Sequence, residues 1–482
     1  MAAMETELKF VFEAATLPAL ERRLARGERT RLRACYFDAV DDRLAHAGVA
    51  LRLRLEGDQW VQTLKARGAG PVTRLEHECP RGTGAAMPAL DLALHAGTPA
   101  GAALAAVLDG AALVPVYETD VWRTHLRVRS GGGAVELALD VGELRAGDAR
   151  EAIREIEFEL LDGPLDALLV LAAQWTLRHG LWLDLRSKAE RGQRLARNVG
   201  RVAATKAAPP QLAKTASAEA TLRAMVGACL AQILPNATEL TAGLGTAAHL
   251  HQLRVGLRRL RSALRLLGDR CPEAPARWEQ PLRTLFAATG ARRNLDVLEG
   301  ELLPALRAAG APELVVNGSA AADAGADAAV VLRRPGVGLL WLELLAFAQG
   351  APAGGAADGG GAALAEARLA KLERRLRKEA ARFASFGDAE CHALRKRLKR
   401  LRYGLELAAP LLPKKRRHVL PALRPLLDLL GQYNDACQAQ AYIAAHAADP
   451  GRAFALGWLA ARREALRGAA ERALAAWLGR ER

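Results

Sequence analysis

The chain has 482 residues, a formal net charge of +15 and a pI near 10.0, with 51% hydrophobic and 25% charged residues. This composition excludes a disordered or fibrous protein, and the length predicts two or three domains, because single cores rarely grow beyond roughly 250 residues. No apolar run is long enough for a membrane span, the first residues lack a signal peptide's apolar stretch, and no CxxC pair is present. We therefore expect a cytoplasmic protein with reduced thiols.

The charge is divided unevenly along the chain. Residues 1–200 carry 26 basic and 28 acidic side chains, a net charge of −2, whereas residues 201–482 carry 42 and 25, a net charge of +17. The two parts therefore predict domains of different chemistry. The basic part is expected to bind a polyanion: nucleic acid, polyphosphate or an anionic membrane.

Residues 4–200 are predicted to be rich in strands, because several short segments alternate strictly between charged and apolar side chains. Helices are expected only at 11–26, 90–108 and 164–179. The charged positions of the alternating segments share one face of each strand and are, in chain order, Glu5, Glu7, Lys9, Arg52, Arg54, Lys65, Arg74, Glu76, Glu78, Glu155, Glu157 and Glu159.

Two interpretations of these charged faces are open. One is an ordinary half-exposed sheet with solvated charges. The other is a closed sheet whose charged lumen holds a highly charged ligand, since a charged interior costs stability. Carboxylates would then hold Mg²⁺ or Mn²⁺, and the Arg and Lys side chains would clamp phosphate oxygens. That combination is typical of phosphoryl transfer to water.

The ordered series of motifs resembles the CYTH domains, also called triphosphate tunnel metalloenzymes. The ExExK motif is present as Glu5-x-Glu7-x-Lys9, and it is followed by Y-F-D at 36–38, G-V-A-L-R-L-R at 48–54, W-V-Q-T-L-K at 60–65, R-L-E-H-E at 74–78, E-I-E-F-E-L at 155–160 and S-K-A-E-R-G at 187–192. The resemblance covers residues 1–202. It implies an eight-stranded antiparallel β-tunnel that hydrolyses triphosphates or, in one branch, cyclises ATP, with Mg²⁺ or Mn²⁺.

The resemblance also implies roles for individual residues. Metal-binding carboxylates are implied at Glu5, Glu7, Asp140, Glu157 and Glu159. Phosphate contacts are implied at Lys9, Arg52, Arg54, Lys65, Arg74, Arg123 and Lys188. Glu76 and Glu78 share a face with Arg74 and are expected to orient water or metal, which gives a catalytic set of Glu5, Glu7, Lys9, Lys65, Glu76 and Glu78.

The second part of the chain is predicted to be helical. A linker is expected at 203–215, and from about residue 219 the sequence is rich in Ala, Leu and Arg, with Ala/Gly-rich breaks at 309–336 and 350–361. His251-Gln-Leu-Arg254 recurs as His392-Ala-Leu-Arg395, and further matches keep the same offset of 141 residues. The constant offset predicts a duplicated helical unit.

Each copy of the repeat predicts an amphipathic helix with one apolar and one basic stripe. The first basic stripe and its neighbour are His251, Arg254, Arg258, Arg261, Arg265 and Arg259; the second, with its neighbours, is His392, Arg395, Lys399, Arg402, Lys396, Arg400 and Tyr403. A solvated helix face normally intersperses acidic side chains, and neither stripe contains one. Because like charges at i,i+4 repel, the stripes favour an anionic ligand. The histidines either add charge near neutral pH or serve as caps.

The two motif helices, at 251–261 and 392–403, resemble those of the CHAD domain, the conserved-histidine α-helical domain. G-A-R-R-N-L-D-V at 290–297 and G-Q-Y-N-D at 431–435 resemble the turns that follow them. The resemblance covers residues 216–480 and implies two pseudo-symmetric helical bundles whose basic faces bind inorganic polyphosphate. One departure is Asn294, where the family usually has Asp; Asp296 is a candidate to compensate for it.

Together these features predict an α+β multidomain chain with metal-dependent hydrolysis of inorganic triphosphate or short polyphosphate in the tunnel and polyphosphate binding by the helices. We expect association with polyphosphate granules. The alternatives are a polyphosphate-binding or localising protein with a weak or vestigial tunnel, and a nucleotide-directed enzyme, either an adenylate cyclase or a thiamine or nucleoside triphosphatase. A nucleotide needs a base pocket, and the lumen positions suggest no aromatic stack. Nucleic acid is disfavoured because aromatic residues are only 5% of the chain. The oligomeric state is left open.

Overall fold

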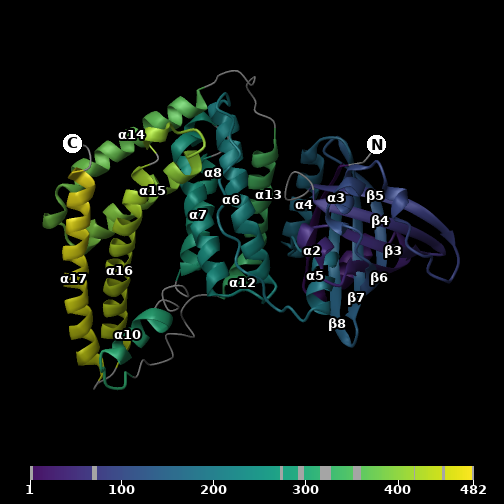
Figure 1. Cartoon of the computed structure of the whole chain (residues 1–482), viewed down its shortest axis with the longest axis horizontal. Helices are drawn as coiled ribbons and strands as arrows, with labels where there is room; N and C mark the ends of the chain where they lie inside the picture. The colour runs from purple at the N-terminus through teal and green to yellow at the C-terminus, as the bar shows by residue number, and fades with distance from the viewer. Residues whose placement is uncertain are drawn as a thin grey trace. The chain divides into compact units, whose positions relative to one another are not determined.

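The computed structural model describes residues 4–67, 73–271, 275–290, 298–314, 327–350, 360–416, 418–447 and 451–479. The chain folds into two compact units, one comprising residues 1–203 and 332–346 and the other residues 204–331 and 347–482 (Figure 1). A sheet occupies the first unit and helices the second, which confirms the predicted fold class. Within the described ranges, no helix is both long and apolar enough to cross a membrane.

Antiparallel strands close into a tunnel in the first unit. The strands are β1 (Met4–Val11), β2 (Glu28–Ala39), β3 (Ala50–Glu56), β4 (Gln59–Arg67), β5 (Thr73–Thr83), β6 (Leu113–Ser130), β7 (Gly133–Ala146), β8 (Ala149–Asp162) and β9 (Trp182–Leu183). Their order is β5-β4-β3-β2-β6-β7-β8-β1-β9, and a further pairing of β1 with β5 closes the ring. The described sheet therefore has nine strands rather than eight, because the short β9 adds to β1 beside the closed set.

Strict alternation along the strands separates the lumen from the outer core. In β3, Leu51, Leu53 and Leu55 are buried outside the tunnel, while Arg52 and Arg54 point into it. Helices α2 (Arg43–Ala47) and α3 (Pro99–Leu108) cover this side of the sheet through an apolar cluster that includes Leu44, Leu64 and Leu104. Helix α4 (Leu165–His179) covers β6, β7 and β8, and α1 (Leu17–Arg23) lies between β1 and β2 in the chain.

Helix α5 (Lys188–Ala196) closes one end of the tunnel. Its Ala189, Leu195 and Ala196 pack against apolar side chains that face the lumen near that end, namely Leu32, Ala34, Tyr36, Tyr117, Val121, Leu144 and Ile153. Ser187 caps the helix by accepting a hydrogen bond from the backbone N–H of Glu190 at 3.1 Å. The sequence did not predict this helix or α2.

Gly192 allows α5 to approach the lumen closely. A Cβ at this position would lie 2.2 Å from ring atoms of the buried Tyr117, so Gly192→Ala must displace the helix or the ring. Alanine in a helix interior normally stabilises by up to about 1 kcal/mol, but this overpacking costs about 1–3 kcal/mol. We therefore expect a net loss of stability in urea unfolding. Gly200→Ala is the control, because a Cβ there meets nothing within 4 Å; equal stability of both variants would contradict the packing described.

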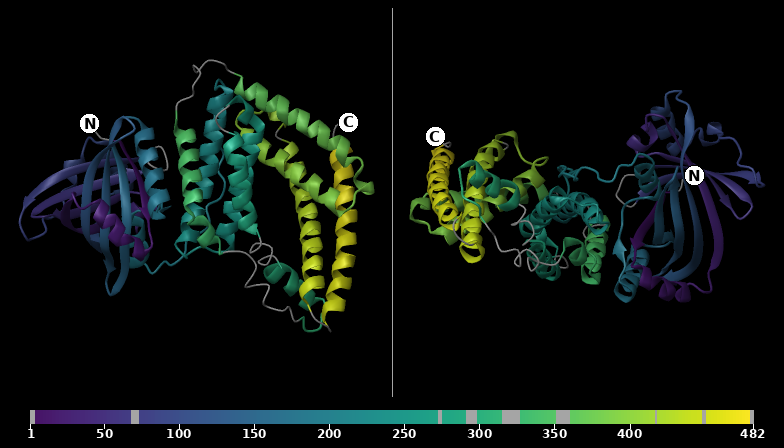
Figure 2. Two further views of the ribbon diagram at one scale, coloured as in Figure 1. Left: turned by 180° about the vertical axis from the view of Figure 1, so that it is seen from behind. Right: turned by 90° about the horizontal axis from the view of Figure 1, so that it is seen from below.

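The second unit is helical. Its longer helices are α6 (Ala218–Thr241), α7 (Ala247–Leu267), α8 (Pro275–Ala288), α14 (Gly361–Ala380), α15 (Asp388–Ala408), α16 (Val419–His446) and α17 (Gly451–Gly479). Shorter ones are α10 (Leu303–Ala308) and α12 (Ala328–Leu332), and α13 (Pro335–Gln349) belongs mostly to the first unit. Figure 2 shows α6 beside α7 and α16 beside α17, and these pairs are in contact.

The structure reproduces the internal repeat. Helices α7 and α15 each have 21 residues, and their first residues, Ala247 and Asp388, are 141 positions apart. The two helices pack against each other. Residues 291–297 of the first turn motif, with Asn294 and Asp296, lie outside the described residues, as do 315–326 and 351–359 of the Ala/Gly-rich breaks.

Candidate active site

A cavity of about 580 Å³ lies inside the closed sheet. Its walls are formed by side chains of β1, β2, β3, β4, β6, β7 and β8 and by α5. Ten of the predicted site residues line it: Glu7, Lys9, Arg52, Arg54, Lys65, Arg123, Asp140, Glu157, Glu159 and Lys188. The period-2 pattern therefore places these residues around a single space, as a closed charged lumen requires.

One wall of the cavity carries a buried carboxylate cluster formed by Asp140, Glu155 and Glu157. Their ligand oxygens lie within 4.8 Å of one another, and Asp140 and Glu155 are fully buried. Nζ of Lys188 lies 2.6 Å from Asp140 Oδ2, 2.5 Å from Glu155 Oε1 and 2.8 Å from Glu157 Oε1. The guanidinium of Arg123 donates two 2.7 Å hydrogen bonds to Asp140 and one of 2.5 Å to Glu157.

These ion pairs keep the cluster charged despite its burial. Burial acts to raise the pKa of Glu157, but Lys188 and Arg123 outweigh it and hold the pKa well below its usual range. The pKa of Asp140 is lowered by the same balance. Burial acts to lower the pKa of Lys188, and the three carboxylates raise it above its usual value. The cluster is therefore anionic and its two partners are cationic near neutral pH.

The opposite wall carries the predicted phosphate clamp. Glu78 Oε1 accepts a 3.1 Å hydrogen bond from Thr63 and lies 3.5 Å from Arg54 and 3.9 Å from Arg52. Glu76 lies 3.0 Å from Nζ of Lys65. Both glutamates thus face the lumen side of β5 and act as counter-ions that orient the basic side chains.

An aromatic pair that we did not expect from the sequence lines the tunnel. The rings of Tyr36 and Tyr117 stack with centroids 4.6 Å apart, because β2 and β6 pair these two residues directly. Arg52 donates a 3.2 Å hydrogen bond to the Tyr36 hydroxyl, and its guanidinium lies over that ring. Tyr117 therefore covers one face of the Tyr36 ring, and the guanidinium of Arg52 lies over the ring and bonds its hydroxyl. Tyr36 thus offers no free ring face on which a nucleobase could stack.

Three outcomes concern individual residues of the prediction. Glu5 and Arg74 are register partners in the β1–β5 pairing, but their side chains lie outside what the structure describes.

Glu155 was not predicted as a site residue, although it shares the charged face of β8 with Glu157. It is fully buried, 3.7 Å from Nζ of Lys9 and 2.9 Å from Arg191 of α5. The same alternation that identified Glu157 could have identified it.

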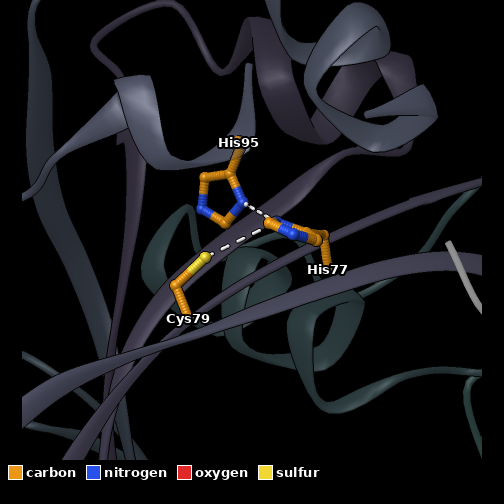
Figure 3. Close-up of side chains that lie close together, drawn as sticks. All are labelled: His77, Cys79 and His95. Atoms are coloured by element: carbon orange, nitrogen blue, oxygen red, sulfur yellow. Dashed lines mark hydrogen bonds between the residues drawn. The ribbon is translucent and has the colours of Figure 1, made fainter. Parts of the chain in front are cut away.

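A second group of potential metal ligands lies on the outer face of β5. Figure 3 shows His77, Cys79 and His95, whose ligand atoms lie within 4.8 Å of one another. The Nδ1 atoms of His77 and His95 are 2.9 Å apart, and Cys79 Sγ lies 3.5 Å from Nδ1 of His77. His95 comes from the short helix η2 (Leu92–His95), which covers β4 and β5.

The hydrogen bonds around His95 favour a metal-free cluster. Gln62 is fixed by the backbone of Asp91, because its Nε2 donates to Asp91 O at 2.8 Å and its Oε1 accepts from Asp91 N at 3.0 Å. Nε2 of Gln62 therefore donates to Nε2 of His95 at 3.0 Å, and the proton of neutral His95 lies on Nδ1, facing His77. A metal at Nδ1 would move that proton to Nε2, where Gln62 already presents a donor.

Acid is expected to destabilise this cluster. Burial, followed by the charge of His77, lowers the pKa of His95 from 6.5 to about 4. Between these two pH values the unfolded chain binds more protons than the folded one. The contribution of neutral His95 to the free energy of unfolding is therefore fully present above pH 6.5 and is lost as the pH falls toward 4. The loss amounts to about 2–3 kcal/mol. Urea unfolding of the first unit across this range should show the slope, and His95→Gln should reduce it; an unchanged slope would contradict the assignment.

Basic side chains from α7 and α15 face one another in the helical unit. Arg258, Arg395, Lys399 and Tyr403 form this basic cluster, in which Arg258 Nε donates a 3.1 Å hydrogen bond to the Tyr403 hydroxyl. Burial, followed by repulsion from Arg395 and Arg258, lowers the pKa of Lys399 to about 6, and Asp435 only partly opposes this. Burial also lowers the pKa of Arg395. The cluster therefore concentrates more positive charge than its acidic neighbours balance.

A glycine leaves room for the guanidinium of the motif arginine in each half of the repeat. A Cβ at Gly290 would lie 3.4 Å from Nη1 of Arg254, and one at Gly431 would lie 3.5 Å from Nη2 of Arg395. These two pairs are related by the repeat offset. Arg254 also donates to the backbone oxygen of Phe286 at 2.7 Å and lies over its ring, so its guanidinium is held in place.

Other members of the predicted basic stripes lie outside this basic cluster. Arg259 is 2% exposed and donates to Gln232 at 2.8 Å and to Ala208 O at 3.1 Å, so it belongs to the core. Arg261 and Arg265 both pair with Glu279 of α8, at 2.7 and 2.5 Å. Three further members contact their own helix or a neighbouring one: His392 forms a hydrogen bond with Asn434, Arg400 donates to Arg265 O, and Arg402 pairs with Glu406. Of the last two members, Lys396 is exposed and His251 is half-buried.

Both parts of the chain match known domain families. Residues 3–193 match the CYTH domain family, and residues 224–444 match the CHAD domain family. The chain is similar to an inorganic triphosphatase of Haemophilus influenzae, at 30% identity over 165 residues that cover 33% of this chain and 44% of that protein. The chain thus spans less than half the length of that relative.

Two solved structures are also similar to this chain. One is the CHAD domain of the plant Ricinus communis, with 28% identity and a TM-score of 0.47, covering 58% of this chain and 98% of that one. The other is a Hippeastrum protein described as having a dominant triphosphatase activity, with 18% identity and a TM-score of 0.29, covering 40% of this chain and 96% of that one.

Proposed function

Because the chain carries a CYTH domain at residues 3–193 and a CHAD domain at residues 224–444, we propose that it hydrolyses inorganic triphosphate or short polyphosphate and binds longer polyphosphate through its helices. The observation that carries the first part is the cavity itself, where a carboxylate cluster and a set of basic side chains face each other. The proposal extends to a cytoplasmic location at polyphosphate granules.

The carboxylates fit a hard divalent cation. Glu7, Asp140, Glu155, Glu157 and Glu159 offer only oxygen donors, which Mg²⁺ and Mn²⁺ prefer, and three of these side chains already bring their oxygens within 4.8 Å of one another. A bound cation would neutralise negative charge on the phosphate oxygens. These residues are our candidates for holding it.

The basic side chains supply the rest of the chemistry. Arg52 and Arg54 offer planar, bidentate donors for phosphate oxygens, and Lys65 adds a point charge. Glu76 pairs with Lys65, and Glu56 and Tyr36 accept hydrogen bonds from Arg54 and Arg52 before substrate arrives, so little reorganisation is needed as charge develops during attack of water on a terminal phosphorus. Burial acts to lower the pKa of Arg52, but Tyr36 and the glutamates raise it above its usual value, so this donor stays charged.

The closed end of the tunnel supports short substrates or chain ends. The apolar contacts of α5 fill that end, so a phosphate chain is expected to enter from the opposite one. The covered faces of Tyr36 leave no stacking partner for a base, which supports inorganic triphosphate over nucleotides.

Substrate preference tests this proposal. With Mg²⁺ present, kcat/KM for tripolyphosphate should exceed that for ATP and thiamine triphosphate by about tenfold or more, because nucleoside groups gain no contact in the tunnel. Phosphate release and cyclic AMP formation should be measured in the same reactions. Cyclic AMP as the main product from ATP, or equal efficiency with ATP, would overturn the proposed substrate class.

Polyphosphate binding by the helical unit rests on the basic cluster. Holding Arg258, Arg395 and Lys399 close together in partly buried positions is unfavourable without an anion, as the lowered pKa of Lys399 indicates. A chain of phosphates would supply regularly spaced charge without requiring aromatic contacts to bases. This supports an extended inorganic anion over nucleic acid.

A further inference from the structure

Lys188 holds a central position in the carboxylate cluster. It is the first residue of α5, its side chain is 11% exposed, and its Nζ forms ion pairs with Asp140, Glu155 and Glu157 at 2.5–2.8 Å. An ammonium ion that contacts three carboxylates at once stands where a cation with oxygen ligands would be bound. Lys188 also lines the cavity, which gives its ammonium a space into which it can turn.

The negative charges of the cluster are already more than compensated. Asp140, Glu155 and Glu157 contribute three negative charges, and the positive groups in ion-pair contact with them are Lys188, Arg123, Lys9 and Arg191. A divalent cation added to this arrangement would meet repulsion from every one of them. At least one positive side chain must therefore leave before the cluster can take a metal.

Lys9 lies 3.7 Å from Glu155 and does not occupy the cluster, so the choice is among the three closer cations, of which Lys188 is the best able to leave. Arg123 is held by two hydrogen bonds to Asp140 and one to Glu157. Arg191 donates to Glu151 and to the backbone oxygen of Ala152, each at 2.7 Å, in addition to Glu155. Among the described residues, the ion pairs of the Lys188 ammonium are with the three carboxylates of the cluster, and a lysine side chain reorients more freely than a planar guanidinium held at several points.

We propose that Lys188 is an internal competitor of the divalent cation, occupying the cluster of Asp140, Glu155 and Glu157 until the metal displaces its ammonium into the cavity. In the displaced position it can contact phosphate, so a single residue serves the resting and the loaded tunnel. The inference rests on the proposed function only in assuming that the tunnel takes a divalent cation, and it concerns binding in the absence of substrate.

Metal binding without substrate tests this directly. Lys188→Met keeps the length of the side chain and removes its charge, so Mg²⁺ or Mn²⁺ should bind about tenfold more tightly or better, measured by calorimetry and by the electron paramagnetic resonance of free Mn²⁺. Arg178→Met is the matched control. It removes one positive charge at the exposed end of α4, outside the cavity lining, and should leave the affinity unchanged.

Stability gives a second readout. Without metal, Lys188→Met and the more polar Lys188→Gln should both melt below the wild type, and Mg²⁺ should raise their melting temperatures more than it raises that of the wild type. Affinities equal to wild type in both variants would overturn the inference, as would variants that stay unfolded even at saturating Mg²⁺. Failure of the wild type to hydrolyse triphosphate would instead count against the proposed function, because these measurements contain no substrate.

Discussion

Replacing Glu157 by Gln is expected to lower kcat for tripolyphosphate by about 10²–10³-fold, as removal of one preorganised electrostatic group typically does. Glu157 contacts Arg123 and Lys188 at once and lines the cavity, so its charge fixes two cations as well as serving as a candidate metal ligand. Glutamine keeps the shape but cannot supply that charge. Phosphate release with saturating Mg²⁺ measures the effect.

The fold should survive this change. Arg123 keeps Asp140, and Lys188 keeps both Asp140 and Glu155, so neither cation is left without a counter-ion. Asp162→Asn is the matched control, because it removes a carboxylate from the exposed end of the same strand, β8. Activity of Glu157→Gln within tenfold of wild type would show that the cluster is structural.

Charge reversal at Lys399 should have the largest effect on the helical unit. Lys399→Glu places a carboxylate between Arg395 and Arg258, where it forms internal ion pairs and cancels the charge offered to a phosphate chain. We expect polyphosphate affinity to fall by about 100-fold, or about 2.7 kcal/mol, while tripolyphosphate hydrolysis is unchanged. Retention on immobilised polyphosphate and titration at fixed salt would measure this.

The lowered pKa of Lys399 adds a pH signature to the same experiment. Lys399 is neutral above about pH 6 and must take up a proton to meet an anion, so wild-type affinity should fall as the pH rises above that value. Lys399→Glu should lose this dependence. Lys371→Glu, the same change at an exposed position of α14, serves as the control. Equal loss of binding in both variants would mean that net charge, not the cluster, decides the affinity.

The charged faces of the strands could be predicted from the sequence because their signal is local. Alternation with a period of two places Glu7, Arg54 and Glu157 on the charged faces of their strands, whereas their assignment to a shared lumen depended on the resemblance to the CYTH domains. The fold class followed from the same pattern and from the change to helical periodicity after the linker.

Other features depend on pairing between distant segments and could not be read from the chain. The stack of Tyr36 on Tyr117 requires the register of β2 on β6, and the contacts of Glu155 require α5 to return to the end of the tunnel. In the helical unit, the basic stripe lacked acids within its own helix, but Glu279 reaches it from α8. Arg259 lies at the stripe's edge, where helical position alone does not separate core from surface.

The decisive measurement of metal-dependent hydrolysis is phosphate release from tripolyphosphate by the chain of 482 residues, with Mg²⁺ and with the metal chelated. We expect turnover with Mg²⁺, its loss on chelation and its recovery when Mg²⁺ or Mn²⁺ is restored. Turnover that is unchanged by chelation, or no phosphate release from tripolyphosphate with either metal, would contradict this expectation.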